Sequence, residues 1–328
     1  HQEEGPDGHG LPGQQEHPKA KIAVTGCPNF SLALTLRYLQ RKKQDQDWDF
    51  SSMKAMLNGA EPISVKIMEE FTHALEKYNL HDYAMMPVYG MAEVTLAVSF
   101  TPVFTPRVIT TLDTEELDRN GRAVPVTSGS HKTTRQLSAV GVALSNVAVR
   151  IVNDKDEPLE ETFVGHIQIK SPAVTAGYYK NPEATAGLFC GEWMRTGDLG
   201  FFLNGYLYIS GRFKEIIFMN GKNYFANDLE TLAGTLDDIV YGKVAVGGYT
   251  DPETSKEKIV IFVASIPESK AEATLQTLRA LFRTSLGIPI DELVLLRSNE
   301  FPKTSSGKIQ RYLMLNRHRN GEYPNKFN

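Results

Sequence analysis

The sequence has little cysteine, and it has no long run of either apolar or basic residues. Cysteine occurs only at Cys27 and Cys190 among 328 residues, which fits a reducing cytoplasm and two separate packed thiols rather than a disulfide framework. No segment reaches the apolar length of a membrane span, and no signal peptide is visible. With a formal net charge of -4 and no Lys/Arg run, neither a nucleic acid nor an anionic membrane is expected as the main partner.

The first 21 residues almost completely lack large apolar side chains. They are rich in Gly, Pro, Gln and His, so they cannot bury enough apolar surface to offset the entropy lost on ordering. His1, His9 and His17 have no fixed spacing with Cys or Asp that would support a metal site. We therefore expect residues 1–21 to form a loose segment.

From residue 21 onward the sequence alternates between strand and helix patterns. Strands are expected at 21–26, 53–58 and 84–90 and helices at 28–43 and 63–78, the last with a Ser64 cap and an apolar face that includes Phe71. Such alternation is typical of α/β architecture, with loops at the strand ends where ligands bind. Residues 101–137 are rich in Thr, Pro, Arg and Gly and are interpreted as a long connection.

The rest of the chain shows two further patterns. Segments 147–152, 165–170 and 205–211 alternate apolar and polar residues, as half-buried antiparallel strands do. After Lys214, strands at 243–248, 258–264 and 292–297 and a helix at 271–287 predict a compact α+β unit of roughly a hundred residues. The predicted organisation is a loose segment 1–21, a larger domain 22–213 and a small C-terminal domain 214–328.

Two short motifs precede residue 101 and carry chemical possibilities. NGAEP at 58–62 places Gly59 and Ala60 in a turn after a strand, where a flat ring could lie against the backbone, although a plain turn explains the motif equally well. YGMAE at 89–93 places the Glu93 carboxylate just beyond a glycine, where it could hold a hard cation, or where it could simply mark a strand-helix corner.

Three motifs follow in the second half. In RTGDLG at 195–200, Asp198 lies between two expected glycine turns and could accept hydrogen bonds from a diol such as ribose, or form an Asx turn. Arg212 and Lys214 flank an apolar strand and could equally take part in surface salt bridges with carboxylates. In FPKTSSGKIQR at 301–311, small residues precede Lys308, which could approach a ligand closely or belong to a solvated basic tail.

The order and spacing of these motifs, taken together, resemble the later core motifs of the adenylate-forming enzymes. The motifs are NGAEP, YGMAE, GHIQIKSPAVTAGYY, RTGDLG, YISGR, MNGKNYFANDLE and FPKTSSGKIQR, and the resemblance runs from about residue 22 to the C-terminus. PNF at 28–30, YGMAEVTLAVSF, LDTEELDRNGRAVP and GKNYFANDLE look like the fatty-acyl-AMP ligase branch. The implied fold is part of the α/β large domain with a β-rich subdomain, followed by a small mobile α+β domain.

The resemblance implies a role for each matching position. Glu93 would bind Mg²⁺, Lys214 sits at the hinge position, and Lys308 would be the catalytic lysine, with Glu93 as the second catalytic residue. The residues that would border the nucleotide and the acyl carbonyl are Gly59, Ala60, Glu61, Tyr89, Gly90, Met91, Asp198, Ile209 and Arg212.

The implied reaction is ATP-dependent activation of a fatty acid, with ATP and Mg²⁺ as cofactors. The acyl group would pass from acyl-adenylate to the phosphopantetheine thiol of an acyl carrier protein, as in polyketide or lipopeptide biosynthesis. An acyl-CoA ligase differs only in the acceptor, and a noncatalytic module that binds a nucleotide or a carrier protein is a further alternative.

One family feature has no counterpart in residues 1–27. The family carries a Ser/Thr/Gly-rich phosphate loop ending in Lys-Gly upstream of the PNF segment, and nothing similar occurs there. We therefore expect this sequence to be the C-terminal part of a longer ligase. By itself it should lack ATP–pyrophosphate exchange, because the β- and γ-phosphates would have no cradle of backbone donors.

Overall fold

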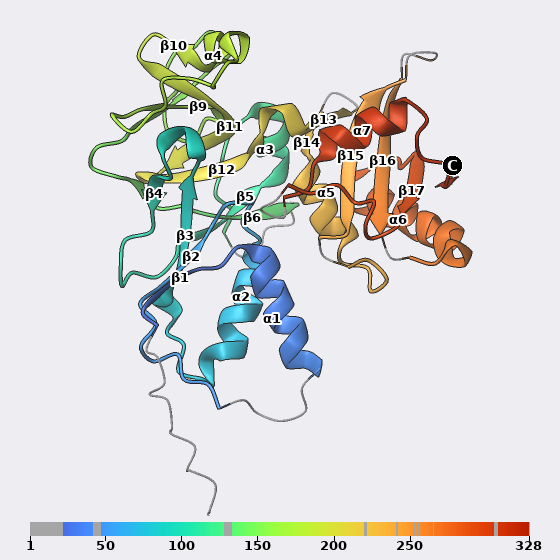
Figure 1. The fold of residues 1–328 in the computed structure, drawn as a ribbon, viewed down its shortest axis with the longest axis horizontal. Helices are drawn as coiled ribbons and strands as arrows, with labels where there is room; N and C mark the ends of the chain where they lie inside the picture. Colours follow the sequence, from blue (N-terminus) through green and yellow to red (C-terminus); the bar gives the residue numbers. More distant parts are fainter. Residues whose placement is uncertain are drawn as a thin grey trace, which may run out of the picture.

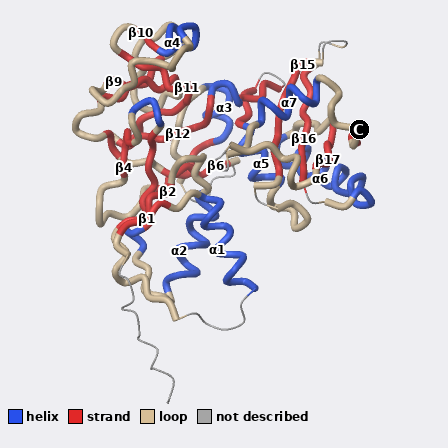
Figure 2. Tube along the Cα trace, in the orientation of Figure 1, coloured by secondary structure: helices blue, strands red, loops and turns tan. Residues whose placement is uncertain are grey.

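The structure is a computed structural model, and it places two regions side by side (Figures 1 and 2). We call residues 22–213 the N-terminal region and residues 214–327 the C-terminal region. The expected loose segment 1–21 lies outside the described residues, as do Ser305, Ser306 and Gly307 next to Lys308. The residues described are 22–41, 47–127, 133–219, 222–240, 242–251, 254, 256–264, 266–304 and 308–327.

The N-terminal region begins with a five-stranded sheet in the order β1-β2-β3-β4-β7. Its first three strands pair in parallel, and β4 and β7 continue the sheet antiparallel. Helices α1 and α2 bury apolar side chains such as Leu32, Met68 and Phe71 in one cluster with Met85 of β3. The elements are β1 (Val24–Gly26), α1 (Asn29–Arg41), β2 (Ala55–Asn58), α2 (Val65–Glu76), η1 (Asp82–Ala84), β3 (Met85–Gly90), β4 (Ala97–Phe100) and β7 (Val142–Ala143).

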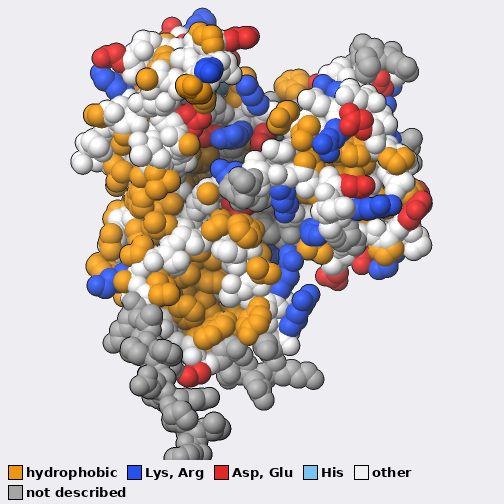
Figure 3. All heavy atoms as spheres, viewed as in Figure 1, with side chains coloured by type: hydrophobic (Ala, Val, Ile, Leu, Met, Phe, Trp, Pro, Cys, Tyr) orange, Lys and Arg blue, Asp and Glu red, His pale blue; other side chains and the backbone are white. Residues whose placement is uncertain are grey.

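The strands and helices expected in this first part are confirmed. The Ser64 hydroxyl accepts a hydrogen bond from the Ile67 backbone N–H at 3.4 Å, so it caps α2 as predicted. Figure 3 shows hydrophobic side chains gathered over the part that holds β1 to β3, α1 and α2. On α1, Phe30, Leu34 and Tyr38 are exposed at helical spacing. This helix therefore has an apolar stripe on its outer face in addition to its buried face.

The prediction that residues 101–137 form a long connection is wrong. The segment contains the antiparallel strands β5 (Ile109–Asp113) and β6 (Thr134–Ser138) and, between them, the helix α3 (Thr114–Asn120). The Asp113 carboxylate accepts hydrogen bonds from the backbone N–H groups of Glu115 at 3.0 Å and Glu116 at 3.3 Å. This cap, followed by good helix formers, stabilises a short helix that overall composition did not indicate.

A β-rich subdomain follows, as expected. β8, β9, β11 and β12 pair antiparallel, and β10 adds a short strand to the edge. The glycine turns expected on either side of Asp198 are wrong, because RTGDLG lies within the long strand β11, where the register shifts between Arg195 and Leu199. Gly197, at φ 76°, allows this irregularity. The elements are β8 (Ala148–Val152), β9 (Gly165–Lys170), α4 (Pro182–Leu188), β10 (Phe189–Cys190), β11 (Trp193–Leu203) and β12 (Tyr206–Arg212).

The C-terminal region is built on a four-stranded sheet in the order β15-β16-β17-β18. The predicted strands and the helix α6 are confirmed, whereas the hairpin β13–β14 and the helices α5 and α7 were not predicted. The elements are η3 (Phe213–Glu215), β13 (Ile216–Met219), β14 (Lys222–Phe225), α5 (Ala226–Ala233), β15 (Val244–Thr250), β16 (Glu257–Ala264), η4 (Glu268–Lys270), α6 (Ala271–Leu286), β17 (Glu292–Leu296), α7 (Arg311–Arg319) and β18 (Lys326–Phe327).

The hydrophobic cores of the two regions are separate. Among the described residues, every core cluster contains either only residues up to Ile209 or only residues from Ile217 onward. None of the helices in the described part of the chain combines the length and the apolar character that a bilayer span requires. Cys27 and Cys190 are both free, and burial raises the pKa of Cys27 to about 12.

Candidate active site

A carboxylate with two donors forms the centre of the candidate site. The Tyr89 hydroxyl, at the end of β3, donates to Asp198 Oδ2 at 2.6 Å, and Arg212 Nε donates to Asp198 Oδ1 at 3.0 Å. Asp198 is buried on β11, whereas the Arg212 side chain at the end of β12 is 58% exposed. Three predicted site residues from distant parts of the sequence therefore meet directly.

Burial dominates the electrostatics of this cluster. It raises the pKa of Asp198 above its ordinary value, although the Tyr89 hydrogen bond and the Arg212 charge favour the ionised form. Burial and the negative charge of Asp198 together raise the pKa of Tyr89 well above its usual range. Tyr89 is therefore a neutral donor. A further donor near the Asp198 carboxylate, such as a ribose hydroxyl, would stabilise the ionised carboxylate.

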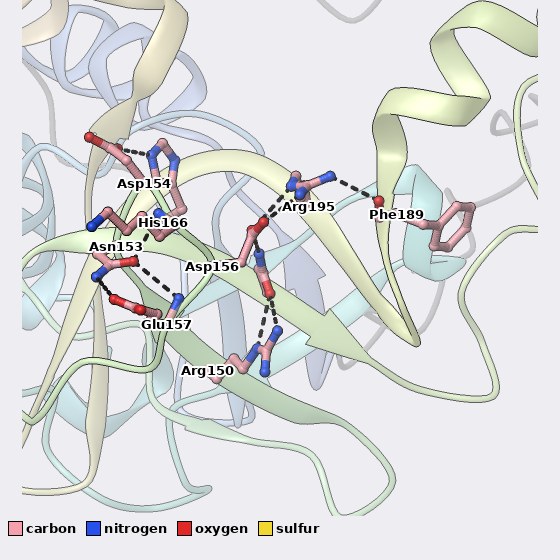
Figure 4. Close-up of polar contacts among 10 residues, drawn as sticks. Arg150, Asn153, Asp154, Asp156, Glu157, His166, Phe189 and Arg195 are labelled. Carbon is pink, nitrogen blue, oxygen red and sulfur yellow. Dashed lines mark hydrogen bonds and ion pairs between the residues drawn. The ribbon is translucent and has the colours of Figure 1, made fainter.

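A polar network holds the strand that carries Asp198 (Figure 4). Arg195, three residues before it on β11, donates to Asp156 at 2.5 and 3.2 Å and to the Phe189 carbonyl at 2.8 Å. This ion pair lowers the pKa of Asp156 to about 2. Arg150 of β8 completes the network through Gln168 of β9. Because one cluster joins β8, β9 and β11, it fixes the position of β11.

Glu93 lies on the short 3₁₀ helix η2 (Ala92–Val94) after β3. Its Oε1 accepts a hydrogen bond from the Tyr178 hydroxyl at 2.8 Å. Burial and Glu93 raise the pKa of Tyr178, while the nearby charge of Arg212 lowers it. Glu93 therefore lies near the Asp198 cluster, to which Tyr178 and Arg212 connect it.

The donor set fits magnesium held jointly by protein and substrate. Within the described ranges, no group of three or more His, Cys, Asp or Glu side chains could hold a metal ion. Mg²⁺ is commonly bound by one or two carboxylates together with substrate phosphates and water rather than by an all-protein cage. A single carboxylate at Glu93 agrees with that arrangement.

The turn after β2 carries Gly59, Ala60 and Glu61. A Cβ on Gly59 would lie 2.8 Å from the Val88 carbonyl oxygen, so the turn packs closely on β3. Ala60 has φ 67°, an uncommon value for a residue with a side chain. Glu61 Oε1 accepts a hydrogen bond from the Phe30 backbone N–H at 2.9 Å. The turn is thus tied to β3 and to the start of α1.

Lys308 faces this turn from the C-terminal region. Burial raises the pKa of Glu61, while the Phe30 N–H and the positive charges of Lys303 and Lys308 counteract the rise. Thr304 makes two hydrogen bonds with Lys308, since its backbone N–H donates to the Lys308 carbonyl at 2.9 Å and its hydroxyl accepts from the Lys308 N–H at 3.1 Å. Lys308 is exposed, and its positive charge acts on Glu61.

The other predicted site residues lie against the core of the β-rich subdomain or between the two regions. Tyr89, Met91 and Ile209 are partly buried and pack against one hydrophobic cluster of the β-rich subdomain. Lys214 is exposed on η3, between the two cores. The roles of all these residues remain predictions.

Sequence reasoning missed three residues that contact the site. Tyr178 binds Glu93, Lys303 lies near Glu61, and Asn29 donates to the Pro62 carbonyl beside Glu61. Each lies within a quoted motif segment, GYY, FPK or PNF. Nothing in those motifs specified a partner, because the pairing depends on segments far apart in the sequence.

Comparisons with known proteins bear on the family and the fold of this chain. The sequence fits the family model described as AMP-binding enzyme over residues 18–179. Residues 18–179 belong to this family. It is 30% identical to the long-chain-fatty-acid–AMP ligase FadD32 of Mycolicibacterium smegmatis over 88% of this chain and 52% of that protein. It is also 30% identical to the medium-chain-fatty-acid–[acyl-carrier-protein] ligase JamA of Moorena producens, over 89% of this chain and 51% of that protein.

Solved structures of AMP-binding enzymes agree with the predicted fold class. A structure from a study of fatty acyl-adenylate ligases from E. coli and L. pneumophila superposes with a TM-score of 0.81 at 28% identity, covering 91% of this chain and 54% of that one. The predicted adenylate-forming fold and the resemblance to the fatty-acyl-AMP ligase branch are confirmed. The chain spans about half the length of the curated relatives it matches.

Proposed function

We propose that this sequence is part of a fatty-acyl-AMP ligase that activates a fatty acid with ATP. The observation that carries the proposal is the buried Asp198 carboxylate, held by Tyr89 and Arg212, in a region that also faces Lys308. The names of the relatives support a fatty acid as the substrate. We assign the complete activity to a ligase that contains this sequence together with a phosphate loop.

The residues divide the work of binding ATP. Asp198, already oriented by two donors, accepts hydrogen bonds from the ribose hydroxyls, and Arg212 assists it. Ala60 is exposed and carries only a methyl group, so the turn can border the adenine ring, and Gly59 beside it lets the turn pack closely on Val88. Ile209 packs near the same ring. Glu61, Gly90 and Met91 border the remaining walls of the nucleotide and acyl site.

The chemical step is an in-line displacement at the α-phosphate. A carboxylate oxygen of the fatty acid forms a bond to the α-phosphorus as the bond to pyrophosphate breaks, giving acyl-adenylate. Lys308 donates hydrogen bonds to the oxygens on which negative charge accumulates, which stabilises the transition state. Glu93 would hold Mg²⁺ together with the phosphates, and the ion would neutralise part of the phosphate charge.

The second step needs a thiol at the place that Lys308 occupies in the first. Rotation of the C-terminal region about Lys214, on the exposed η3, removes the lysine and admits the acceptor. For this branch we propose the phosphopantetheine thiol of an acyl carrier protein, which the name of the JamA relative supports. The thiol attacks the acyl carbonyl, and AMP leaves.

Replacing Lys308 tests the first step. In a ligase that contains this sequence, Lys308→Ala should slow fatty-acid-dependent ATP–pyrophosphate exchange by about 10²- to 10³-fold, because one preorganised charge at the transition state is lost. ATP should still bind, since the Asp198 cluster is unchanged. Lys170→Ala is the matched control, because Lys170, at the end of β9, is a partly exposed lysine that pairs with Glu192. Equal exchange rates in Lys308→Ala and the parent would contradict the assignment.

The acceptor is tested separately with preformed acyl-adenylate. Transfer to a phosphopantetheinylated carrier protein should be much faster than transfer to coenzyme A. The reverse preference would favour an acyl-CoA ligase. Nucleotide binding without any exchange, even with a phosphate loop present, would favour a noncatalytic module.

A further inference from the structure

Arg135 of β6 makes contacts that join the two regions. Its Nη2 lies 2.6 Å from Asp228 Oδ2 on α5 and donates to the Ser210 carbonyl of β12 at 3.2 Å. Its guanidinium also lies 5.2 Å from the centre of the Phe225 ring at the end of β14. One side chain of the N-terminal region thus makes ionic and cation–π contacts with the C-terminal region.

The contact removes most of this guanidinium from water. The Arg135 side chain is 14% exposed, and the Asp228 side chain is 38% exposed. Asp118 on α3 is another carboxylate nearby, but its distance of 3.8 Å from Arg135 Nη1 is too long for a hydrogen bond. Asp228 is therefore the main partner of a largely desolvated cation, and separation of the regions would leave that cation without it.

The surrounding surface is closely packed at one point and open beside it. A Cβ on Gly211 would lie 2.2 Å from Cδ1 of Phe225, so the ring of the C-terminal region rests on the backbone of β12. Next to this point is a cavity of about 310 Å³ that Asp118, Phe213 and Phe225 help to line. This part of the contact is therefore not filled, and the Arg135 contacts lie beside it.

Helix α5 connects the Arg135 contact to the start of α7, close to Lys308 in the sequence. Two residues after Asp228, Glu230 accepts two hydrogen bonds from Arg311, each at 2.6 Å. Arg311 begins α7 and follows Lys308 by three residues. Its side chain is 13% exposed and also binds Glu215 of η3 at 2.9 Å. The position of α5 therefore influences the position of Lys308, which lies just before α7.

We propose that Arg135 and Asp228 form a latch that positions Lys308 against the Glu61 side of the site for adenylation. The latch rests on the proposed function, and it adds a positioning pair to the predicted hinge at Lys214. It holds during acyl-adenylate formation and separates when the C-terminal region rotates for thiol transfer. The pair is thus a positioning element that does not touch the reacting atoms.

The distance between the regions tests the latch without any activity. Spin labels at Glu183→Cys and Arg283→Cys, both exposed, report the separation in the 328-residue chain with Cys190→Ser as background. Arg135→Met keeps the aliphatic packing on Phe225 and removes the ion pair, so it should add a second, different distance population. Asp228→Asn should do the same, and the double variant should resemble either single variant.

Arg107→Met is the matched control for that measurement. Arg107 pairs with Asp82 within the N-terminal region, and its side chain is 10% exposed. This variant should keep the parent distance distribution. If Arg135→Met and Asp228→Asn, both folded by circular dichroism, also keep the parent distribution, the latch is overturned.

Half-reaction rates provide the second test, in a ligase that contains this sequence. Arg135→Met should lower kcat for ATP–pyrophosphate exchange by about tenfold or more. The free-energy cost of removing one partner of a buried ion pair commonly exceeds the 1.4 kcal/mol that corresponds to a factor of ten. KM for ATP and transfer from preformed acyl-adenylate should change little, and Arg135→Lys should recover part of the loss. Equal slowing of both half-reactions would indicate a merely structural residue and overturn the latch. If the parent shows no exchange, the proposed function fails. The spin-label distances still test the latch, because they do not depend on activity.

Discussion

Asp118 on α3 is a carboxylate that water hardly reaches. Its side chain is 11% exposed, and its Oδ1 has no hydrogen-bond partner. Burial raises the pKa of Asp118 to about 6, against the lowering effect of Arg135, and the negative charge of Asp228 adds to the rise. The folded protein therefore binds a proton at Asp118 more tightly than the unfolded chain does, where the pKa is about 3.9.

This raised pKa predicts how Asp118→Asn changes stability with pH. The wild-type protein loses stability as the pH rises from about 4 through 6, because the unfolded chain ionises first. Asn carries no charge, so the variant avoids the free-energy cost of ionising Asp118 in the folded protein. This cost is at most about 3 kcal/mol and reaches its full value above pH 6. Urea unfolding should show a gain in the free energy of unfolding that is about 1 kcal/mol larger at pH 8 than at pH 5. A gain independent of pH would disprove ionisation of Asp118 as its cause.

Strand β3 depends on the absence of a side chain at its last residue, Gly90. A Cβ there would lie 1.8 Å from the Leu96 carbonyl oxygen, which is backbone and cannot move aside as a flexible side chain could. Gly90→Ala should lower the free energy of unfolding by about 3 kcal/mol or more, since overpacking displaces the main chain of β4. It should also weaken nucleotide binding, because Tyr89 is adjacent.

Gly187 in α4 provides the matched control for Gly90→Ala. A Cβ there would meet nothing within 4 Å, and the residue is exposed in the helix. Gly187→Ala should stabilise the protein by about 0.5 to 1 kcal/mol, because alanine loses less backbone entropy on folding. Thermal unfolding should therefore shift in opposite directions for the two variants, and a shared direction would refute the steric argument at Gly90.

Several of the elements that the sequence predicted correctly bury one side. The periodic apolar face of α2 and the alternation in β8 and β9 follow from burial on one side, so they are visible in sequence. Helix α3 depends on the Asp113 cap, and the irregular part of β11 depends on pairing with β9 and β12, so neither shows in local composition. At the site, the motifs identified Asp198 and Tyr89, but not that they bind one another across 109 positions of sequence.

At the scale of the whole molecule, the separate cores predict where the chain opens first. Arg212 and Lys214 are exposed at the junction, and the C-terminal region has its own hydrophobic clusters. Limited trypsin digestion should cut within residues 211–222 and release a stable C-terminal fragment, because exposed junctions are cleaved before packed domains. In Lys214→Gln, cutting should move to Arg212. Uniform resistance of this segment, identified by mass spectrometry of the products, would speak against a hinge there.

The Phe225 ring that rests on Gly211 gives the rotation a thermal signature. Any rotation that separates the two regions exposes this ring and its neighbours to water, and exposure of apolar surface raises the heat capacity. The enthalpy of opening must then change with temperature, so a van't Hoff plot of the two orientations should be curved. Because the hydrophobic attraction weakens on cooling, cold should favour the open orientation. An organism that grows in the cold would therefore meet a different balance between the two half-reactions from one that grows in the heat, with the same residues at the site.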